Sequence, residues 1–228
     1  METQALKELE HRYRQVSSQI RSLTPNSQKV ELLVVTKGHG ADALRHLYAL
    51  GQNSFGENYA QELLAKSQEL QDLSISWIFI GHLQSNKIRK IVQVASAIQT
   101  VGTLRQAEQI ARAANECGKT PFPIWLEVNA DQEGAKHGCP MNEVLDLAHA
   151  IQKLPELGLQ GLMAIPPSRY QDTECLEIPD LYTQLRHLAD RIGDQQLSLG
   201  MSGDLRLAIQ AGSNLVRIGT AILGPRQV

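Results

Sequence analysis

The feature that most constrains this chain is a regular alternation between two kinds of residue pattern. Short apolar or β-branched runs, typical of strands buried on both faces, recur along the sequence and are separated by helical patterns. Strands that alternate with helices pair side by side in a parallel sheet, and the helices cover its faces. The eight predicted strands are Val30–Thr36, Ser54–Glu57, Trp77–Ile80, Ala97–Val101, Ile124–Val128, Leu159–Ala164, Leu197–Met201 and Leu215–Ile218.

The helical patterns are bounded by residues that start and stop helices. Thr103 and Gln106 have the spacing of a capping box, and glycines follow the last turns of several segments. Pro140 is predicted at a first helical position, and Asn86 and Ser202 are predicted N-caps. The predicted helices are Glu2–Leu23, which precedes the first strand, and Ala41–Leu50, Tyr59–Leu70, Lys87–Val94, Thr103–Cys117, Pro140–Leu154, Pro179–Ile192 and Gly203–Gln210.

The number of strands and the length of 228 residues suit closure of the sheet into a barrel. We therefore predict a single α/β domain over residues 1–228, a (β/α)8 or TIM barrel with an extra N-terminal helix. The alternative is an open, doubly wound sheet. A glycine-rich dinucleotide-binding sequence after the first strand would favour that alternative, and none occurs there.

The composition limits which cellular compartment and which classes of binding partner are expected. Lys and Arg total 22 against 24 Asp and Glu, so nothing predicts a nucleic acid or an anionic membrane surface as partner. No apolar run approaches the roughly 18 residues of a membrane span, and Met1–Glu10 lacks the apolar core of a signal peptide. Cys117, Cys139 and Cys175 are odd in number and far apart, which argues against a disulfide framework or structural zinc. A cytoplasmic protein is the expectation.

In barrels of this kind the active site lies at the carboxyl ends of the strands. Lys37 follows the first predicted strand. Burial there would lower the pKa of its amine, and a neutral amine is the form that bonds to an aldehyde. The plain alternative is a lysine that leaves the strand and extends into solvent.

Small polar residues follow the last two predicted strands, where barrels often bind phosphate. They are Ser202, Gly203 and Asp204 after one strand, and Gly219 and Thr220 after the other. Hydroxyl groups and the free N–H groups at the start of a helix suit an anion, and a glycine lets it approach the backbone. Taken singly, an N-cap serine and a turn glycine are the more ordinary interpretation.

Other polar residues at strand ends are ambiguous. Arg217 shares a strand face with Gly219, and if it faces inward it could donate to a ring nitrogen that stays unprotonated. A solvent-facing arginine is the plain alternative. His82 is interpreted as an ordinary polar residue. The loop after the fifth strand holds Glu133, Lys136 and His137, but their spacing matches no metal-ligand pattern, and we expect a surface loop without metal.

Six motifs occur in order on the predicted strand ends: Val34-Val35-Thr36-Lys37, Phe55-Gly56-Glu57-Asn58-Tyr59, Gly81-His82-Leu83-Gln84-Ser85-Asn86-Lys87, Gly161-Leu162-Met163, Leu197-Ser198-Leu199-Gly200-Met201-Ser202-Gly203-Asp204 and Val216-Arg217-Ile218-Gly219-Thr220-Ala221-Ile222. Together they resemble the motifs of the pyridoxal phosphate homeostasis protein family. The resemblance covers about Leu6 to Gly224. One departure is visible after the first strand, where family members usually continue Lys-Thr-Lys-Pro and this chain has Lys37-Gly38-His39-Gly40.

The resemblance implies a barrel similar to that of alanine racemase, the fold type III arrangement, with pyridoxal 5′-phosphate (PLP) as cofactor. It implies no catalytic residue and no metal ligand. The implied cofactor-binding residues are Lys37, which forms the internal aldimine; Ser202, Gly219 and Thr220, which hold the phosphate; Arg217, which faces the pyridine nitrogen; Asn58, near the ring; and Ser198 and Met201, which line the same pocket.

The function implied is PLP binding for intracellular PLP homeostasis or carriage, without catalysis, with transient contacts to PLP-dependent apoenzymes. Two alternatives stay open. A PLP-dependent amino-acid racemase would need a second base, for which Tyr59 or His82 is available, since the added racemase domain is not expected after Ala221–Val228. A sugar-phosphate lyase or isomerase would use Lys37 as a Schiff base without any cofactor.

Overall fold

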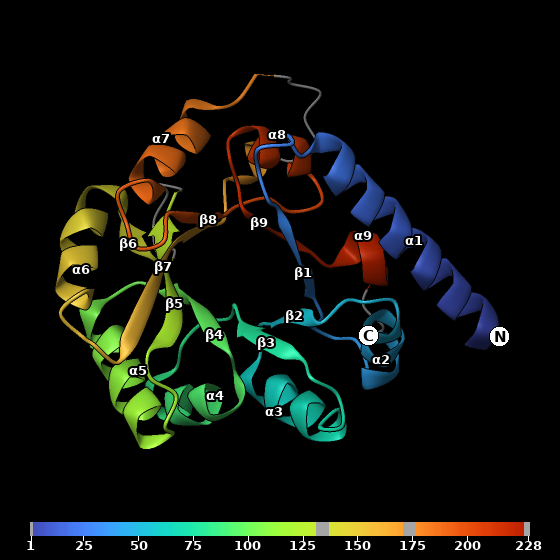
Figure 1. The fold of residues 1–228 in the computed structure, drawn as a ribbon, viewed down its shortest axis with the longest axis horizontal. Coiled ribbons are helices and arrows are strands. Elements are labelled where there is room, and N and C mark those ends of the chain that lie inside the picture. The colour runs from blue at the N-terminus through green and yellow to red at the C-terminus, as the bar shows by residue number, and fades with distance from the viewer. Residues whose placement is uncertain (1, 131–136, 171–176, 226–228) are drawn as a thin grey trace.

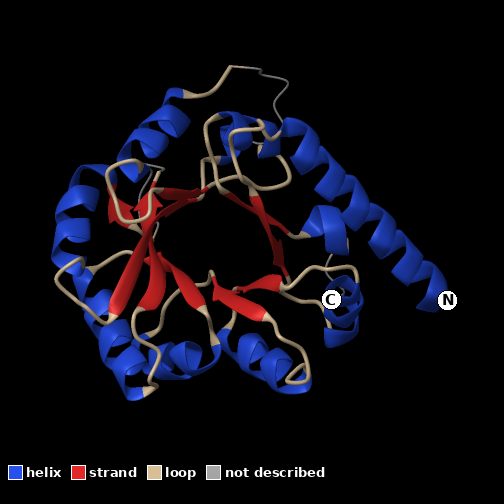
Figure 2. Cartoon of the chain, in the orientation of Figure 1, coloured by secondary structure: helices blue, strands red, loops and turns tan. Residues whose placement is uncertain are grey.

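The computed structural model describes residues 2–130, 137–170 and 177–225. Over this part of the chain, eight parallel strands form a closed barrel, as predicted, with helices around it (Figures 1 and 2). A short ninth strand, β6, pairs only with the end of β5. The strands are β1 (Glu31–Val35), β2 (Ser54–Glu57), β3 (Ser76–Phe79), β4 (Ala97–Val101), β5 (Phe122–Asn129), β6 (Cys139–Pro140), β7 (Leu157–Ala164), β8 (Gln196–Ser198) and β9 (Leu215–Ile218).

The barrel closes because the first and last strands pair. β1 lies between β2 and β9, and residue Val34 is in register with both Phe55 and Ile218. β4 pairs with β5, which completes the ring on the opposite side. The doubly wound alternative is therefore excluded, because an open sheet leaves two strand edges unpaired. Closure also places the carboxyl ends of β1 and β9 side by side.

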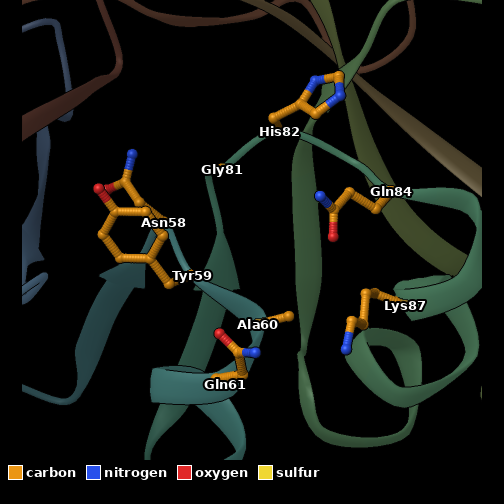
Figure 3. Close-up of a pocket in the computed structure, with 8 residues that line it drawn as sticks. All are labelled: Asn58, Tyr59, Ala60, Gln61, Gly81, His82, Gln84 and Lys87. Carbon is orange, nitrogen blue, oxygen red and sulfur yellow. The ribbon is translucent and has the colours of Figure 1, made fainter.

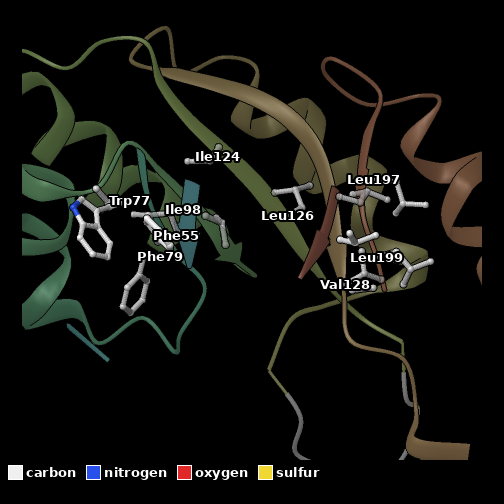
Figure 4. Packing of buried hydrophobic residues seen from close by; sticks show 14 of the residues in the cluster. Phe55, Trp77, Phe79, Ile98, Ile124, Leu126, Val128, Leu197 and Leu199 are labelled. Atoms are coloured by element: carbon white, nitrogen blue, oxygen red, sulfur yellow. The ribbon is translucent and has the colours of Figure 1, made fainter. Parts of the chain in front are cut away.

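Side chains alternate between the two faces of each strand and build two apolar clusters. The larger cluster lies between the barrel wall and the helices; Figure 4 shows part of it, including Phe55, Trp77 and Phe79. The smaller cluster fills the barrel interior. Its buried members are Leu33, Ile78, Ala97, Trp125, Met163 and Leu215.

The helices surround the barrel, and α1 is the additional N-terminal helix predicted from the sequence (Figure 1). Its apolar face is buried through Leu9, Val16 and Ile20, and Arg12 Nε donates to the Ile222 carbonyl at 2.7 Å. The helices are α1 (Glu2–Leu23), α2 (Ala41–Ala49), α3 (Ala60–Glu69), α4 (Ile88–Val94), α5 (Leu104–Glu116), α6 (Val144–Ile151), α7 (Asp180–Ala189), α8 (Leu205–Gln210) and α9 (Thr220–Leu223), with 3-10 turns η1 (Ser85–Lys87), η2 (Met141–Glu143) and η3 (Ser168–Tyr170).

The predicted start of α5 is confirmed, and those of two other helices are wrong. The Gln106 N–H donates to Thr103 Oγ1 at 3.2 Å, as a capping box requires. Pro140 does not begin a helix, because it pairs with Asn129 as extended chain in β6. Asn86 is not an N-cap, because it lies inside η1 and α4 begins at Ile88.

The last predicted strand–helix connection differs from the structure in two ways. β8 ends at Ser198 instead of Met201, because Gly200 adopts a left-handed φ of +105° that interrupts the extended chain. Ser202 does not cap the next helix, which begins at Leu205 and not at Gly203. The Asp204 carboxylate accepts the Met201 N–H at 2.6 Å, and this closes a turn over residues 201–204 that competes with helical geometry.

Candidate cofactor site

Lys37 lies at the carboxyl end of β1, on the interior side of the barrel wall. The Thr36 N–H donates to the Gly56 carbonyl at 2.9 Å, so the ladder with β2 continues for one residue beyond the assigned strand. Leu33 packs in the interior cluster. Alternation therefore places Val35 and Lys37 on the same side as Leu33. The Lys37 side chain is partly buried.

The end of β9 lies directly beside the Lys37 strand. The register of Val34 with Ile218 places Gly219 next to Val35. A Cβ at Gly219 would stand 3.1 Å from the Val35 carbonyl oxygen, so a larger residue would crowd the two strands. Thr220 is exposed and begins α9. The structure thus brings Lys37 together with Gly219 and Thr220, the predicted phosphate-binding residues that follow β9.

The predicted phosphate residue Ser202 lies in the turn after β8, the neighbour of β9. The turn is rigidly held by the buried side chain of Asp204. Its Oδ1 accepts the Met201 N–H, and its Oδ2 accepts the Tyr182 hydroxyl at 2.6 Å. Ser202 is exposed at this turn and Met201 is partly buried. All three predicted phosphate residues therefore follow adjacent strands at one end of the barrel.

Arg217 faces the barrel interior and is buried, so the solvent-facing alternative that the sequence left open is excluded. Its guanidinium donates to the Ser198 carbonyl at 2.8 Å, to Ser198 Oγ at 2.7 Å and to the Ala164 carbonyl at 2.8 Å. Burial lowers the pKa of Arg217 to about 10, and the nearby carboxylates of Asp204 and Glu127 oppose this shift. The guanidinium is still charged at neutral pH, fixed and desolvated.

Ser198 is fully buried and acts mainly as support for Arg217. Its hydroxyl accepts from Arg217 and donates to Gln99 Oε1 at 2.9 Å. The chain of contacts from Arg217 through Ser198 to Gln99 crosses the interior from β9 to β4. This arrangement fixes the orientation of the guanidinium before any ligand binds.

Several buried polar atoms on the inner side of the wall lack a hydrogen-bond partner among the described residues. They are Asn58 Oδ1, Gln99 Nε2 and Trp125 Nε1. Gly56 faces Leu33 and Ile80 inside the barrel, so alternation places Asn58 on that side too. Buried polar groups in folded proteins are normally paired. The unpartnered oxygen of Asn58 beside the Lys37 strand therefore fits a polar ligand in this end of the barrel.

A pocket of about 320 Å³ adjoins Asn58 at the ends of β2 and β3 (Figure 3). One side comes from the start of α3, with Tyr59 and Gln61, and the other from η1 and the residues before it. His82 is exposed on its rim, and its ring stacks on that of His137 with centroids 4.0 Å apart. The lining residues are Asn58, Tyr59, Ala60, Gln61, Gly81, His82, Gln84 and Lys87.

A buried ion-pair cluster behind Lys37 escaped the sequence analysis. Glu57 is fully buried in β2, and its carboxylate lies 2.7 Å from the ammonium of Lys66 in α3. Lys66 also pairs with Glu62 at 2.7 Å. The only sequence signals are an acidic residue inside an otherwise buried strand and the four-residue spacing of Glu62 and Lys66, a common surface pattern.

Among the described residues there is no group of three His, Cys, Asp or Glu side chains placed to hold a metal ion. Glu133 and Lys136 of the predicted surface loop, and Cys175, lie outside the described residues. Within the same described part of the chain, no helix has both the length and the apolar character needed to span a bilayer.

Comparison with known proteins assigns the fold and then the family. The chain matches the family model described as alanine racemase, N-terminal domain, over residues 5–227, and so belongs to that class of barrel domains. It is 41% identical to the pyridoxal phosphate homeostasis protein of Pseudomonas aeruginosa over 198 residues, which cover 86% of this chain and 85% of that protein. It is 37% identical to the protein of the same name from Schizosaccharomyces pombe over 220 residues, which cover 92% and 90% of the two chains. The chain belongs to the pyridoxal phosphate homeostasis protein family, and the prediction from its motifs is confirmed.

A solved structure of PipY from Synechococcus elongatus, with PLP bound, has the same fold as this chain. The TM-score is 0.79 at 32% sequence identity, and the match covers 95% of this chain and 100% of PipY.

Proposed function

We propose that this protein binds PLP and serves the homeostasis or carriage of that cofactor in the cytoplasm, as a single barrel domain. The observation that carries the proposal is the placement of Lys37 beside the end of β9, where Gly219 and Thr220 follow the strand. Relatives named pyridoxal phosphate homeostasis proteins and the PLP-bound PipY structure support it. The described cysteines Cys117 and Cys139 are free thiols, which suits a reducing compartment.

Each end of the cofactor would be held by a different part of the barrel rim. PLP supplies an aldehyde, to which the amine of Lys37 would bond, and a phosphate at the other end of the ring. Ser202 and Thr220 would donate hydroxyl hydrogen bonds to the phosphate, and Gly219 would let it approach the backbone. Arg217 would donate to the ring nitrogen, Asn58 would lie near the ring, and Met201 and Ser198 would border the pocket.

We infer that the protein has no catalytic activity of its own. A protonated ring nitrogen strengthens the ability of PLP to stabilise a carbanion. A guanidinium whose pKa is still about 10 donates a hydrogen bond but keeps its proton at neutral pH. Arg217 would therefore hold the ring without making it a strong electron sink. The proposed partners of the protein are PLP-dependent apoenzymes that take up the cofactor.

An absorbance spectrum before and after borohydride reduction tests the proposal. We expect a near-ultraviolet or visible band that reduction removes, with the mass increment of the reduced cofactor on the peptide that contains Lys37. The Lys37→Ala variant should lose the band and keep the fold, measured by circular dichroism. Lys87→Ala is the matched control, because Lys87 lines the neighbouring pocket. Its band should be unchanged.

The result that would refute the proposal is a Lys37→Ala protein with an unchanged band, or a label on another lysine. Adding L-alanine and following α-proton exchange separates the carrier from a racemase. Exchange at the rate of free PLP supports a non-catalytic role, and exchange well above that rate contradicts it.

A further inference from the structure

The two peptide groups that flank Lys37 are both held from outside the barrel wall. On one side, the Thr36 carbonyl accepts from Lys66 Nζ at 2.8 Å. On the other, the Gly38 N–H donates to Glu62 Oε2 at 2.9 Å. The Lys66 ammonium joins these two contacts, because it lies 2.7 Å from the same Glu62 oxygen.

Glu57 ties this cluster to the next strand of the site. Its Oε2 accepts from Lys66 Nζ at 2.7 Å and from Thr36 Oγ1 at 2.9 Å. Its Oε1 accepts the Asn58 N–H at 2.8 Å. One carboxylate therefore holds the Thr36 side chain, the Lys66 ammonium and the backbone N–H of Asn58, the residue proposed to lie near the cofactor ring.

The local sequence makes such support necessary. β1 ends at Val35, and the chain after Lys37 contains Gly38, with a φ of +75°, and Gly40. Glycines leave the backbone free to adopt many conformations, and ordering a flexible segment on binding weakens affinity. Contacts that fix the loop in advance remove part of that cost.

We propose that Glu57, Glu62 and Lys66 form a clamp that positions Lys37 for its bond to the cofactor. The inference rests on the proposed function. The clamp residues are positioning residues, since they act through the backbone around Lys37. Lys66 and Glu57 are nearly or fully buried, with side-chain exposures of 8% and 0%, whereas Glu62 is 32% exposed. Glu62 is therefore the member that can be changed with least damage to the fold.

The test compares Glu62→Ala with Glu62→Gln, which keeps an oxygen able to accept the Gly38 N–H. Asp72→Ala is the matched control, because Asp72 forms an exposed ion pair with Arg45 away from residues 36–38. Hydrogen exchange of the peptide containing Gly38 is measured in apoprotein, and PLP affinity by spectroscopic titration. We expect Glu62→Ala to exchange faster and to bind PLP about tenfold more weakly, as for loss of one hydrogen bond to a charged group.

Glu62→Gln should recover most of both losses, and Asp72→Ala should match the wild type. Unchanged exchange and affinity in Glu62→Ala would overturn the inference, and so would an equal loss in Asp72→Ala. Neither outcome bears on the assignment of Lys37 as the residue that bonds to the cofactor. That assignment is tested separately, by the absorbance band of Lys37→Ala. The exchange measurement needs no bound cofactor and therefore tests the clamp by itself.

Discussion

Replacing Lys66 by Met should destabilise the protein strongly. The substitution leaves the carboxylate of Glu57, which is fully buried, without its cation at 2.7 Å. It also removes the hydrogen bond to the Thr36 carbonyl. Breaking a buried ion pair by removing one partner costs about 3–5 kcal/mol. For a domain of this length each kcal/mol lowers the melting temperature by about 2–4 °C, so we expect a decrease of roughly 6–20 °C.

The double variant Glu57→Gln with Lys66→Met should recover most of this loss. A glutamine at position 57 keeps an oxygen for the Asn58 N–H, and its amide can donate to Thr36 Oγ1, so no buried charge is left. Urea unfolding of the wild type, both single variants and the double variant gives the coupling energy. A cost below about 1 kcal/mol for Lys66→Met, or single-variant costs that simply add, would refute the reasoning.

Two further predictions concern other parts of the barrel. Gly200→Ala should cost about 2–5 kcal/mol, because φ is +105° and the new Cβ would lie 2.6 Å from Ala208 Cβ, whereas Gly40→Ala, with nothing within 4 Å, should be nearly neutral in thermal unfolding. Burial raises the pKa of Glu127, so its protonated carboxyl group favours folding below the unfolded-state pKa, and this contribution is lost as pH rises through the higher folded-state pKa. Glu127→Gln should therefore gain stability over the wild type at about pH 8 and much less at about pH 5 in urea unfolding, and a constant difference would contradict this.

The barrel was predictable because its signals are local and repeated. Each strand is a short apolar run, and alternation with helices forces parallel pairing. Once eight strands close into a ring, the first and last must be neighbours, so Lys37 and Gly219 can be placed together without any knowledge of side-chain contacts. Period-two alternation likewise placed Arg217 on the same strand face as Gly219, and the structure shows that this face is the interior one.

The features that the sequence does not predict depend on local conformation or on single contacts between distant elements. The end of β8 is set by the conformation of Gly200, and a glycine in an apolar run carries no sign of its φ angle. The turn after β8 is fixed by Asp204 through Tyr182 of α7, which is a tertiary contact. The partnership of Glu57 with Lys66 likewise joins a strand to a helix.

At the strand ends of this barrel, one residue faces the cofactor site and the residue before it packs against the helices. Lys37 and Asn58 lie on the interior side, where a cofactor would bind, and the residues before them, Thr36 and Glu57, face the helix layer. A residue that must stay accessible to a ligand cannot be packed tightly on its own side. Its neighbour can be, because the opposite face of the strand is covered by α3 and is dry enough to strengthen a hydrogen bond to Lys66. For that reason a helix residue outside the wall can control a lysine inside it, and the affinity for PLP should depend on residues that never touch the cofactor.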